Sequence, residues 1–157
     1  MRIVANSSPL IALAKIEKMD LLRYDIVIPK AVFDEITKPK KEYGKELHEW
    51  GKDRVVKVEN KRAIEYLEII LGRGETEAIV LAEEINAEVV LIDDLKARKI
   101  ANLRGLKVIG TIGILLDAKE KGLIREVKPL LDELAKKKIR ISKQLYNHAL
   151  ELTNEEE

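Results

Sequence analysis

The strongest chemical signal in the sequence is a pair of adjacent aspartates, Asp93 and Asp94, directly after the apolar run 89–92. Such a run is typical of a buried strand, and a basic segment with helical spacing follows it. Two carboxylates at a strand end repel each other unless a positive group lies between them or one of them caps a helix. Asp94 is suited to cap a helix predicted at 94–104, which leaves Asp93 unexplained.

Two glutamates also interrupt the apolar faces of their predicted helices. Successive helical side chains rotate by about 100°, so Glu35 falls on the apolar face of a helix at 30–37. Glu75 stacks over the apolar positions of a helix at 75–86, whereas Glu77 points nearly the opposite way. Local explanations stay open, because a helix dipole favours acids in the first turn and Glu35 could reach water or a nearby lysine.

The three inward acids, Glu35, Glu75 and Asp93, point to a shared cation when they are taken together. Burying an unpaired carboxylate costs several kcal/mol, and the group protonates before it accepts that cost. The sequence has no cysteine, and the candidate ligands are carboxylate oxygens, with no histidine among them. Such ligands favour Mg²⁺ or Mn²⁺ over Zn²⁺, so the sequence predicts a magnesium or manganese site.

Strands and helices alternate along the chain, which predicts an α/β fold with a mainly parallel sheet covered on both faces. Function in such sheets collects outside the carboxyl ends of the strands, where Asp93 is expected. The predicted strands are 2–5, 25–29, 54–59 at an edge, 88–92 and 106–110. The predicted helices are Pro9–Lys18 capped by Ser8, 30–37, part of 38–53, 61–71, 75–86, 94–104, 111–121, 126–137 and 142–155.

Composition sets limits on the class of protein. A chain of 157 residues with 46% hydrophobic and 4% aromatic residues suits one aliphatic α/β domain. The formal net charge of +1 means that any nucleic-acid contact must come from a local patch. The absence of cysteine, and an N-terminus too short and polar for a signal peptide or membrane span, predict a cytoplasmic protein without a membrane partner.

Five motifs in order resemble the PIN domain of metal-dependent ribonucleases, in particular a prokaryotic branch of that family. The motifs are NSSPLIALAKI, VIPKAVFDEI, GRGETEAIVLAEE, VVLIDDLKARKIA and VIGTIGILLDAKEKGLI. The four acidic positions of the family fall on Asn6, Glu35, Glu75 and Asp93, and the last two are eighteen residues apart, as in the family. The resemblance covers roughly residues 1–140, and 141–157 is predicted to form a C-terminal helix and acidic tail of the same unit.

This resemblance implies a three-layer α/β/α sandwich that hydrolyses RNA phosphodiesters with metal-activated water. It implies one or two Mg²⁺ or Mn²⁺ ions held at the four positions, with Glu35, Glu75, Asp93 and Asp94 as catalytic acids. Many relatives are toxins of toxin–antitoxin pairs, held inactive by a small antitoxin and commonly dimeric. The expected partners are therefore RNA, an antitoxin protein and a second copy of the chain.

Asn6 departs from the family pattern, because most PIN domains have Asp at this position. Its amide oxygen can still face a metal ion or its water but brings no negative charge, which should weaken cation binding. The ribonuclease hypothesis therefore has a rival, a PIN domain that binds nucleic acid or protein without cleaving it. A third hypothesis, a phosphoryl-accepting signalling domain, fits less well because its acid pair would lie on the first strand.

Several side chains near the acids are candidates for RNA contacts. Ser7 is predicted at the same sheet edge as Asn6, and Thr111 follows the strand 106–110, where it could cap a helix or contact a phosphate. The basic residues Lys96, Arg98 and Lys99 follow the aspartate pair. They could contact the phosphate backbone or form a solvated helix face.

Overall fold

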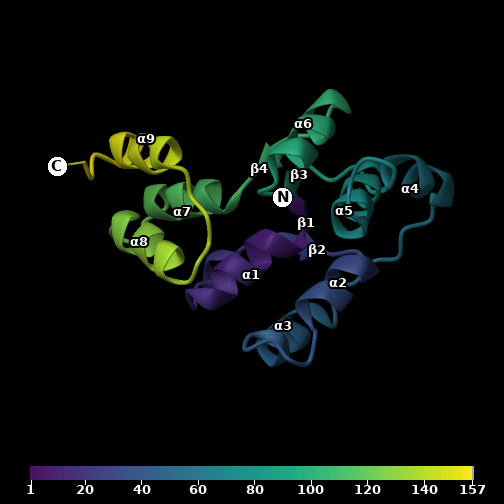
Figure 1. Cartoon of the computed structure of the whole chain (residues 1–157), viewed down its shortest axis with the longest axis horizontal. Coiled ribbons are helices and arrows are strands. Elements are labelled where there is room, and N and C mark those ends of the chain that lie inside the picture. Colours follow the sequence, from purple (N-terminus) through teal and green to yellow (C-terminus); the bar gives the residue numbers. More distant parts are fainter. Residues whose placement is uncertain (157) are drawn as a thin grey trace.

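Four short apolar segments form a parallel sheet at the centre of the molecule (Figure 1). The structure is a computed structural model that describes residues 1–156. Glu157, the last residue of the predicted acidic tail, lies outside the described residues. The strands are β1 (Arg2–Ala5), β2 (Asp25–Val27), β3 (Val89–Leu91) and β4 (Val108–Ile109), in the order β2-β1-β3-β4. All three pairings are parallel, as the alternation of strands and helices predicted.

Helices connect the strands and cover both faces of the sheet, which confirms the predicted three-layer α/β/α fold. Within residues 1–156 they are α1 (Ser7–Lys15), α2 (Lys30–Ile36), α3 (Gly44–Gly51), α4 (Lys61–Leu67), α5 (Arg73–Glu84), α6 (Leu95–Leu103), α7 (Thr111–Glu120), α8 (Lys128–Lys136) and α9 (Lys143–Thr153). A short 3₁₀ helix spans Met19–Leu21.

Two hydrophobic cores lie on opposite faces of the sheet, because side chains alternate along each strand. Ile3 and Leu91 point to a core that includes buried residues of α1, α7, α8 and α9. Val4 and Val90 point to the other core, which is built with α4, α5 and α6. The sheet is therefore buried on both faces, and only its edges and strand ends can present a site.

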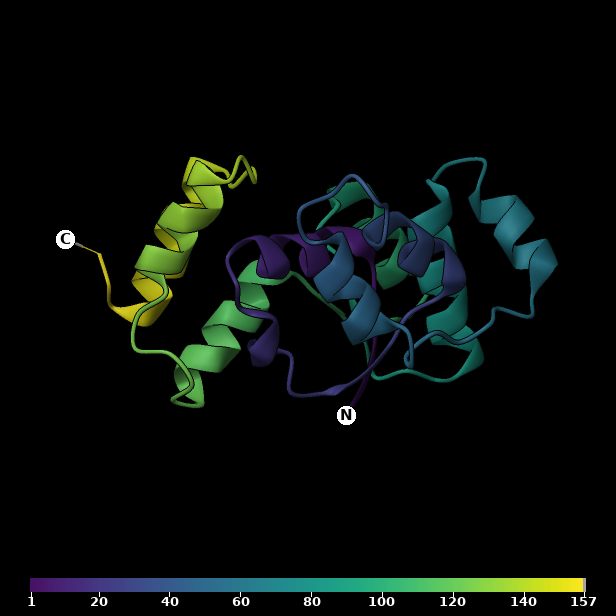
Figure 2. The same cartoon turned by 90° about the horizontal axis from the view of Figure 1, so that it is seen from below.

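The C-terminal helices α8 and α9 lie together beyond α7, at one end of the molecule (Figure 2). Whether these segments pack on the domain was open from the sequence, and the buried residues of both helices belong to the α1 core. Glu155, which follows α9, contacts the start of α8, because its carboxylate accepts hydrogen bonds from the backbone N–H groups of Val127 (2.9 Å) and Lys128 (2.8 Å). Lys119 Nζ donates to the same carboxylate at 2.9 Å. Burial raises the pKa of Glu155, but these donors outweigh burial and hold the pKa at about 2.

Two predicted elements are wrong in detail. Helix α1 begins at Ser7, not Pro9, so Ser8 lies inside the helix and is not its cap. The predicted edge strand 54–59 reduces to one parallel bridge between Ile28 and Val55. The reason is that Pro29 follows Ile28 and leads directly into α2, so β2 offers no further N–H group to pair with.

None of the helices in the part of the chain that the structure describes is both long and apolar enough to cross a membrane.

Candidate active site at the carboxyl edge of the sheet

The ends of the two central strands bring Asn6 and Asp93 to the same edge of the sheet. Asn6 follows β1 directly, and its backbone N–H donates to the carbonyl oxygen of Leu91 in β3 at 2.9 Å. Asp93 lies two residues beyond Leu91 on the same strand end. The predicted convergence of these two positions follows from the parallel pairing of β1 with β3.

Glu35 reaches this edge from α2 and is held there by Ser7. The hydroxyl of Ser7, which is buried in the first turn of α1, donates to Glu35 Oε2 at 2.7 Å. The other oxygen, Oε1, lies only 2.5 Å from the point where a Cβ atom at Gly74 would sit, and Asn6 Oδ1 lies 3.3 Å from that point. Asn6 and Glu35 therefore each place an oxygen atom beside Gly74, and a side chain at this position would displace the Glu35 carboxylate.

Asn6 Oδ1 has no hydrogen-bond partner among residues 1–156, although Asn6 is only 3% exposed. Asn6 occupies the N-cap position of α1 but makes no side-chain capping bond. Leaving a buried acceptor unsatisfied costs about 1–3 kcal/mol, so a cation or a water molecule facing this oxygen would be stabilising. Thr76 Oγ1 on α5 is also buried and unpartnered within the described residues.

Asp93 and Asp94 each cap a different helix. The backbone N–H of Thr111 donates to Asp93 Oδ1 at 2.7 Å, and the Thr111 hydroxyl donates to Asp93 Oδ2, so Asp93 caps α7. Asp94 is exposed and caps α6 by accepting the N–H of Ala97 at 2.9 Å. The expectation that capping explains only one aspartate is wrong, because two helices begin beside the end of β3. Thr111 is likewise engaged with Asp93, which is a structural role.

Arg98 lies beside Asp93, away from the solvated face of α6. Its Nη1 atom donates to the carbonyl oxygen of Ile92 at 3.0 Å. A Cβ atom at Gly110 would lie 2.7 Å from both Arg98 Nη1 and Asp93 Oδ1, so Gly110 leaves room for both charged groups. The guanidinium therefore offsets part of the negative charge at this end of the edge, while Lys96 and Lys99 are exposed.

The predicted orientations of Glu75 and Glu77 are wrong. Glu77 is 7% exposed and accepts hydrogen bonds from the N–H of Ala31 (3.2 Å) and from Arg73 Nε (2.6 Å). Glu75 is half-buried and turns back over the start of α5, with Oε2 3.1 Å from the Cβ position of Gly72. The reason is that α5 packs against α2 as well as the sheet, so the Glu77 face is an interface between helices.

One local signal in the sequence could have identified Glu77. Arg73 stands four residues before it, which is the spacing of an ion pair along a helix. The carboxylate also meets the first turn of α2, where a backbone N–H lacks a partner within its own helix. Glu77 thus ties α5 to the helix that carries Glu35.

The acids at the edge form two groups in the structure. Glu35 faces Asn6, and Asp93 faces Thr111, and no three acidic or histidine side chains within residues 1–156 are close enough together to hold a metal ion. Asn6 Oδ1 and Glu35 Oε1, which both lie beside Gly74, are hard oxygens of the type that Mg²⁺ and Mn²⁺ prefer. The chemistry of this pair and the unpartnered amide oxygen therefore fit such an ion.

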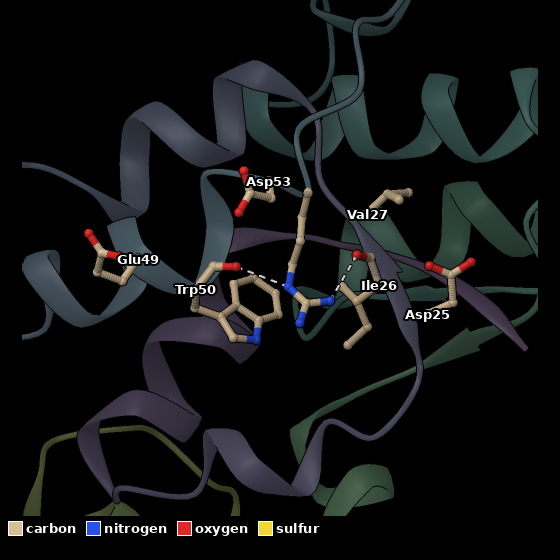
Figure 3. A pocket seen from close by; sticks show the side chains of 7 residues that line it. Asp25, Ile26, Val27, Glu49, Trp50 and Asp53 are labelled. Atoms are coloured by element: carbon tan, nitrogen blue, oxygen red, sulfur yellow. Dashed lines mark hydrogen bonds between the residues drawn. The ribbon is translucent and has the colours of Figure 1, made fainter.

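A hollow of about 430 Å³ elsewhere on the molecule has a different character (Figure 3). It lies beside the edge strand β2, where Asp25, Asp53 and Trp50 contribute to its lining. Arg54 stacks on Trp50 at 4.5 Å from the ring centroid and donates to the carbonyl oxygen of Ile26 at 3.4 Å. Arg54 thus covers a carbonyl group of the open sheet edge, a position where other strands would otherwise pair.

The parallel sheet, covered by helices on both faces and with acidic and amide side chains at its carboxyl edge, is a three-layer α/β/α fold. A family profile described as PIN domain matches residues 2–155, and the chain belongs to the PIN-domain family. Members of this family generally use divalent metal ions, and many bind nucleic acid or occur in toxin–antitoxin pairs. No curated protein and no solved structure matches the chain.

Proposed function

We propose that this protein is a Mg²⁺- or Mn²⁺-dependent ribonuclease that hydrolyses RNA phosphodiesters at the carboxyl edge of its sheet. The observation that carries the proposal is the unpartnered, buried oxygen of Asn6, which lies beside Gly74 as Glu35 Oε1 does. Membership of the PIN-domain family gives this pair of oxygens a chemical context.

The residues of the edge have separate tasks in this proposal. Asn6 and Glu35 would hold the ion, and Asp93 and Glu75 are the candidates for contacts with its water molecules. A divalent ion lowers the pKa of bound water and neutralises charge that builds on the phosphate. Ser7 fixes Glu35 by its hydrogen bond. Arg98 places a positive charge beside Asp93, where it would attract a substrate phosphate.

Metal-dependent cleavage of RNA by the purified chain tests the proposal. Glu35→Gln and Asp93→Asn are expected to lower the cleavage rate by at least tenfold in Mg²⁺ or Mn²⁺, since each removes a negative charge from the edge. Asp34→Asn is a matched control, because Asp34 lies next to Glu35 in α2 but is exposed and pairs only with Lys30. If all three variants are well folded and cleave RNA as fast as the wild type, the assignment of the site is refuted.

Asn6 favours a second candidate function, a PIN domain that binds RNA or protein without cleaving it. An amide at this position contributes no charge, and Asp93 already has hydrogen-bond donors on both oxygens. In this case neither metal supports cleavage by the wild-type chain. Asn6→Asp would then be expected to raise Mn²⁺ affinity and to create cleavage activity, which calorimetry and an RNA gel assay would show.

We further propose that the protein acts in the cytoplasm, pairs with a small antitoxin and forms a homodimer, as many PIN-domain toxins do. We also propose that residues 141–157 fold as part of the same unit as residues 1–140. The exposed apolar residues Tyr66, Ile69 and Ile70, which precede α5, would suit a contact with the antitoxin or with a second copy of the chain. Light scattering on the wild type and on Ile69→Asp tests the dimer, which the variant should weaken.

A further inference from the structure

A groove of about 680 Å³ separates the start of α6 from α9. We call it the α6–α9 groove and define it by the residues that line it, which are Leu95 at the start of α6 and, at or within α9, Ser142, Gln144, Leu145, Asn147, His148 and Glu151. Its volume lies within the range of roughly 300–1,000 Å³ that is usual for sites of small organic groups.

The groove begins beside the candidate active site. Leu95 is two residues beyond Asp93, and Asp94 between them caps the helix whose first residue is Leu95. Two residues of extended chain span at most about 7 Å. If a phosphate binds at this end of the strands, beside the Arg98 guanidinium, the neighbouring nucleotide lies within reach of the groove.

The lining of the groove combines apolar surface with side chains that are free to form hydrogen bonds. Leu95 is 83% exposed and Leu145 is 45% exposed, so both present apolar surface to the groove. Gln144 and Asn147 are exposed, and the structure of residues 1–156 gives their amide groups no hydrogen bond. The imidazole of His148 is 61% exposed and approaches only Glu151, at 3.9 Å.

An unpaired nucleobase has the matching chemistry. Its faces are apolar and stack on histidine or other flat groups, and its edge carries donors and acceptors that amide side chains read. A partner helix would instead require a continuous apolar stripe, and here amide groups and an imidazole separate the leucines. The exposed lysines Lys96 and Lys143, which are next in sequence to lining residues, would offset the charge of Glu151 and attract the flanking phosphates.

We propose that the α6–α9 groove binds an unpaired base next to the scissile phosphate, so that α9 sets the nucleotide preference of the protein. The proposal rests on the proposed ribonuclease function for its substrate. It assigns to Gln144 and Asn147 the contact with the base edge, and to Leu95 and His148 the contact with the base faces.

The test uses binding and cleavage separately. Fluorescence anisotropy with short labelled oligo(U), oligo(A) and oligo(C), in EDTA, measures RNA affinity without cleavage, and a Mn²⁺ assay on mixed-sequence RNA measures cleavage preference. The variant is Gln144→Ala with Asn147→Ala. Asn102→Ala is the matched control, since Asn102 is an exposed asparagine on α6 outside the groove. The groove variant is expected to lose about tenfold in affinity for the preferred base, and the control to lose none.

Four outcomes separate the two proposals. Loss of affinity and of base preference in the groove variant alone supports the groove, even if the wild type does not cleave and the ribonuclease proposal fails. Wild-type cleavage with unchanged affinity and preference in the groove variant overturns the groove and leaves the ribonuclease. A wild type that binds no RNA overturns both. A wild-type dimer that Leu145→Asp converts to a monomer shows that a second copy fills the groove, which also overturns it.

Discussion

Replacing Gly74 by alanine should damage the candidate metal site while leaving the fold largely intact. The new Cβ atom would lie 2.5 Å from Glu35 Oε1, and real Cβ contacts are essentially never shorter than 3.0 Å. The Glu35 carboxylate must therefore move by about half an ångström or more away from Gly74. The same movement strains the 2.7 Å hydrogen bond from Ser7.

The two energetic consequences of Gly74→Ala oppose each other. Alanine in place of glycine favours a helix by at most about 1 kcal/mol, and less in a first turn such as this one. Weakening a buried hydrogen bond to a charged group costs about 1.5–3 kcal/mol if the bond is lost altogether. The net change in the free energy of unfolding should therefore be a destabilisation of about 1 kcal/mol. Loss of the positioned carboxylate should lower Mn²⁺ affinity by roughly ten- to hundredfold, the range known for groups that orient metal ligands.

A double-mutant cycle with Glu35→Ala isolates the contact. Urea unfolding and Mn²⁺ calorimetry would be measured on the wild type, Gly74→Ala, Glu35→Ala and the double variant. Without the Glu35 carboxylate the new methyl group enters vacated space, so Gly74→Ala should then stabilise the protein by up to about 1 kcal/mol. The expected coupling energy is about 1–3 kcal/mol, as for other residues in contact. If Gly74→Ala has the same effect in both backgrounds and leaves Mn²⁺ affinity unchanged, the inferred geometry of Asn6, Glu35 and Gly74 is wrong.

Three further predictions concern single side chains. Glu77→Gln should destabilise the protein by about 1.5–3 kcal/mol in urea unfolding because the buried Glu77 carboxylate accepts two hydrogen bonds. Glu83→Gln, which breaks a partly exposed pair with Arg104, should cost at most about 1 kcal/mol. The low pKa of Glu155, about 2, means that its contribution is complete above its ordinary pKa of 4.5 and is lost as the pH falls through 2. Glu155→Gln should therefore cost up to about 3 kcal/mol at pH 7, and the unfolding curves of variant and wild type should converge toward pH 2; a constant gap would contradict the assignment. Ser7→Ala should weaken Mn²⁺ binding and Ser7→Thr should restore it, whereas equal loss in both would assign Ser7 a packing role.

The sequence predicted the fold well because the strands are short apolar runs with turn residues at their ends. The runs 2–5, 25–29 and 88–92 each contain an observed strand, and the apolar periodicity of 75–86 marks α5 to within two residues. The position of Asn6 and Asp93 at one edge follows from parallel pairing alone, so sequence periodicity was sufficient to place them.

Side-chain direction near helix ends was less predictable. The helical rotation that assigned Glu75 to the inside assumed a sheet as the only neighbour of α5, but α2 packs on another side and buries Glu77. The same limit applies to Asp93, because the start of α7, eighteen residues away, provides the N–H group that it caps. Neither contact is visible until the tertiary neighbour of each carboxylate is known.

These contacts change the electrostatic argument for a cation. Glu77 and Asp93 accept hydrogen bonds from the starts of helices, and the half-buried Glu35 accepts one from Ser7, whereas the buried Asn6 Oδ1 has no partner within residues 1–156. We therefore expect the fold to be stable without a cation and the ion to serve the proposed catalysis. Saturating Mn²⁺ should then raise the unfolding free energy only by the binding term RT ln(1 + [Mn²⁺]/Kd), and EDTA should leave a cooperative unfolding transition. Loss of that transition in EDTA would show that the acids need the ion to fold.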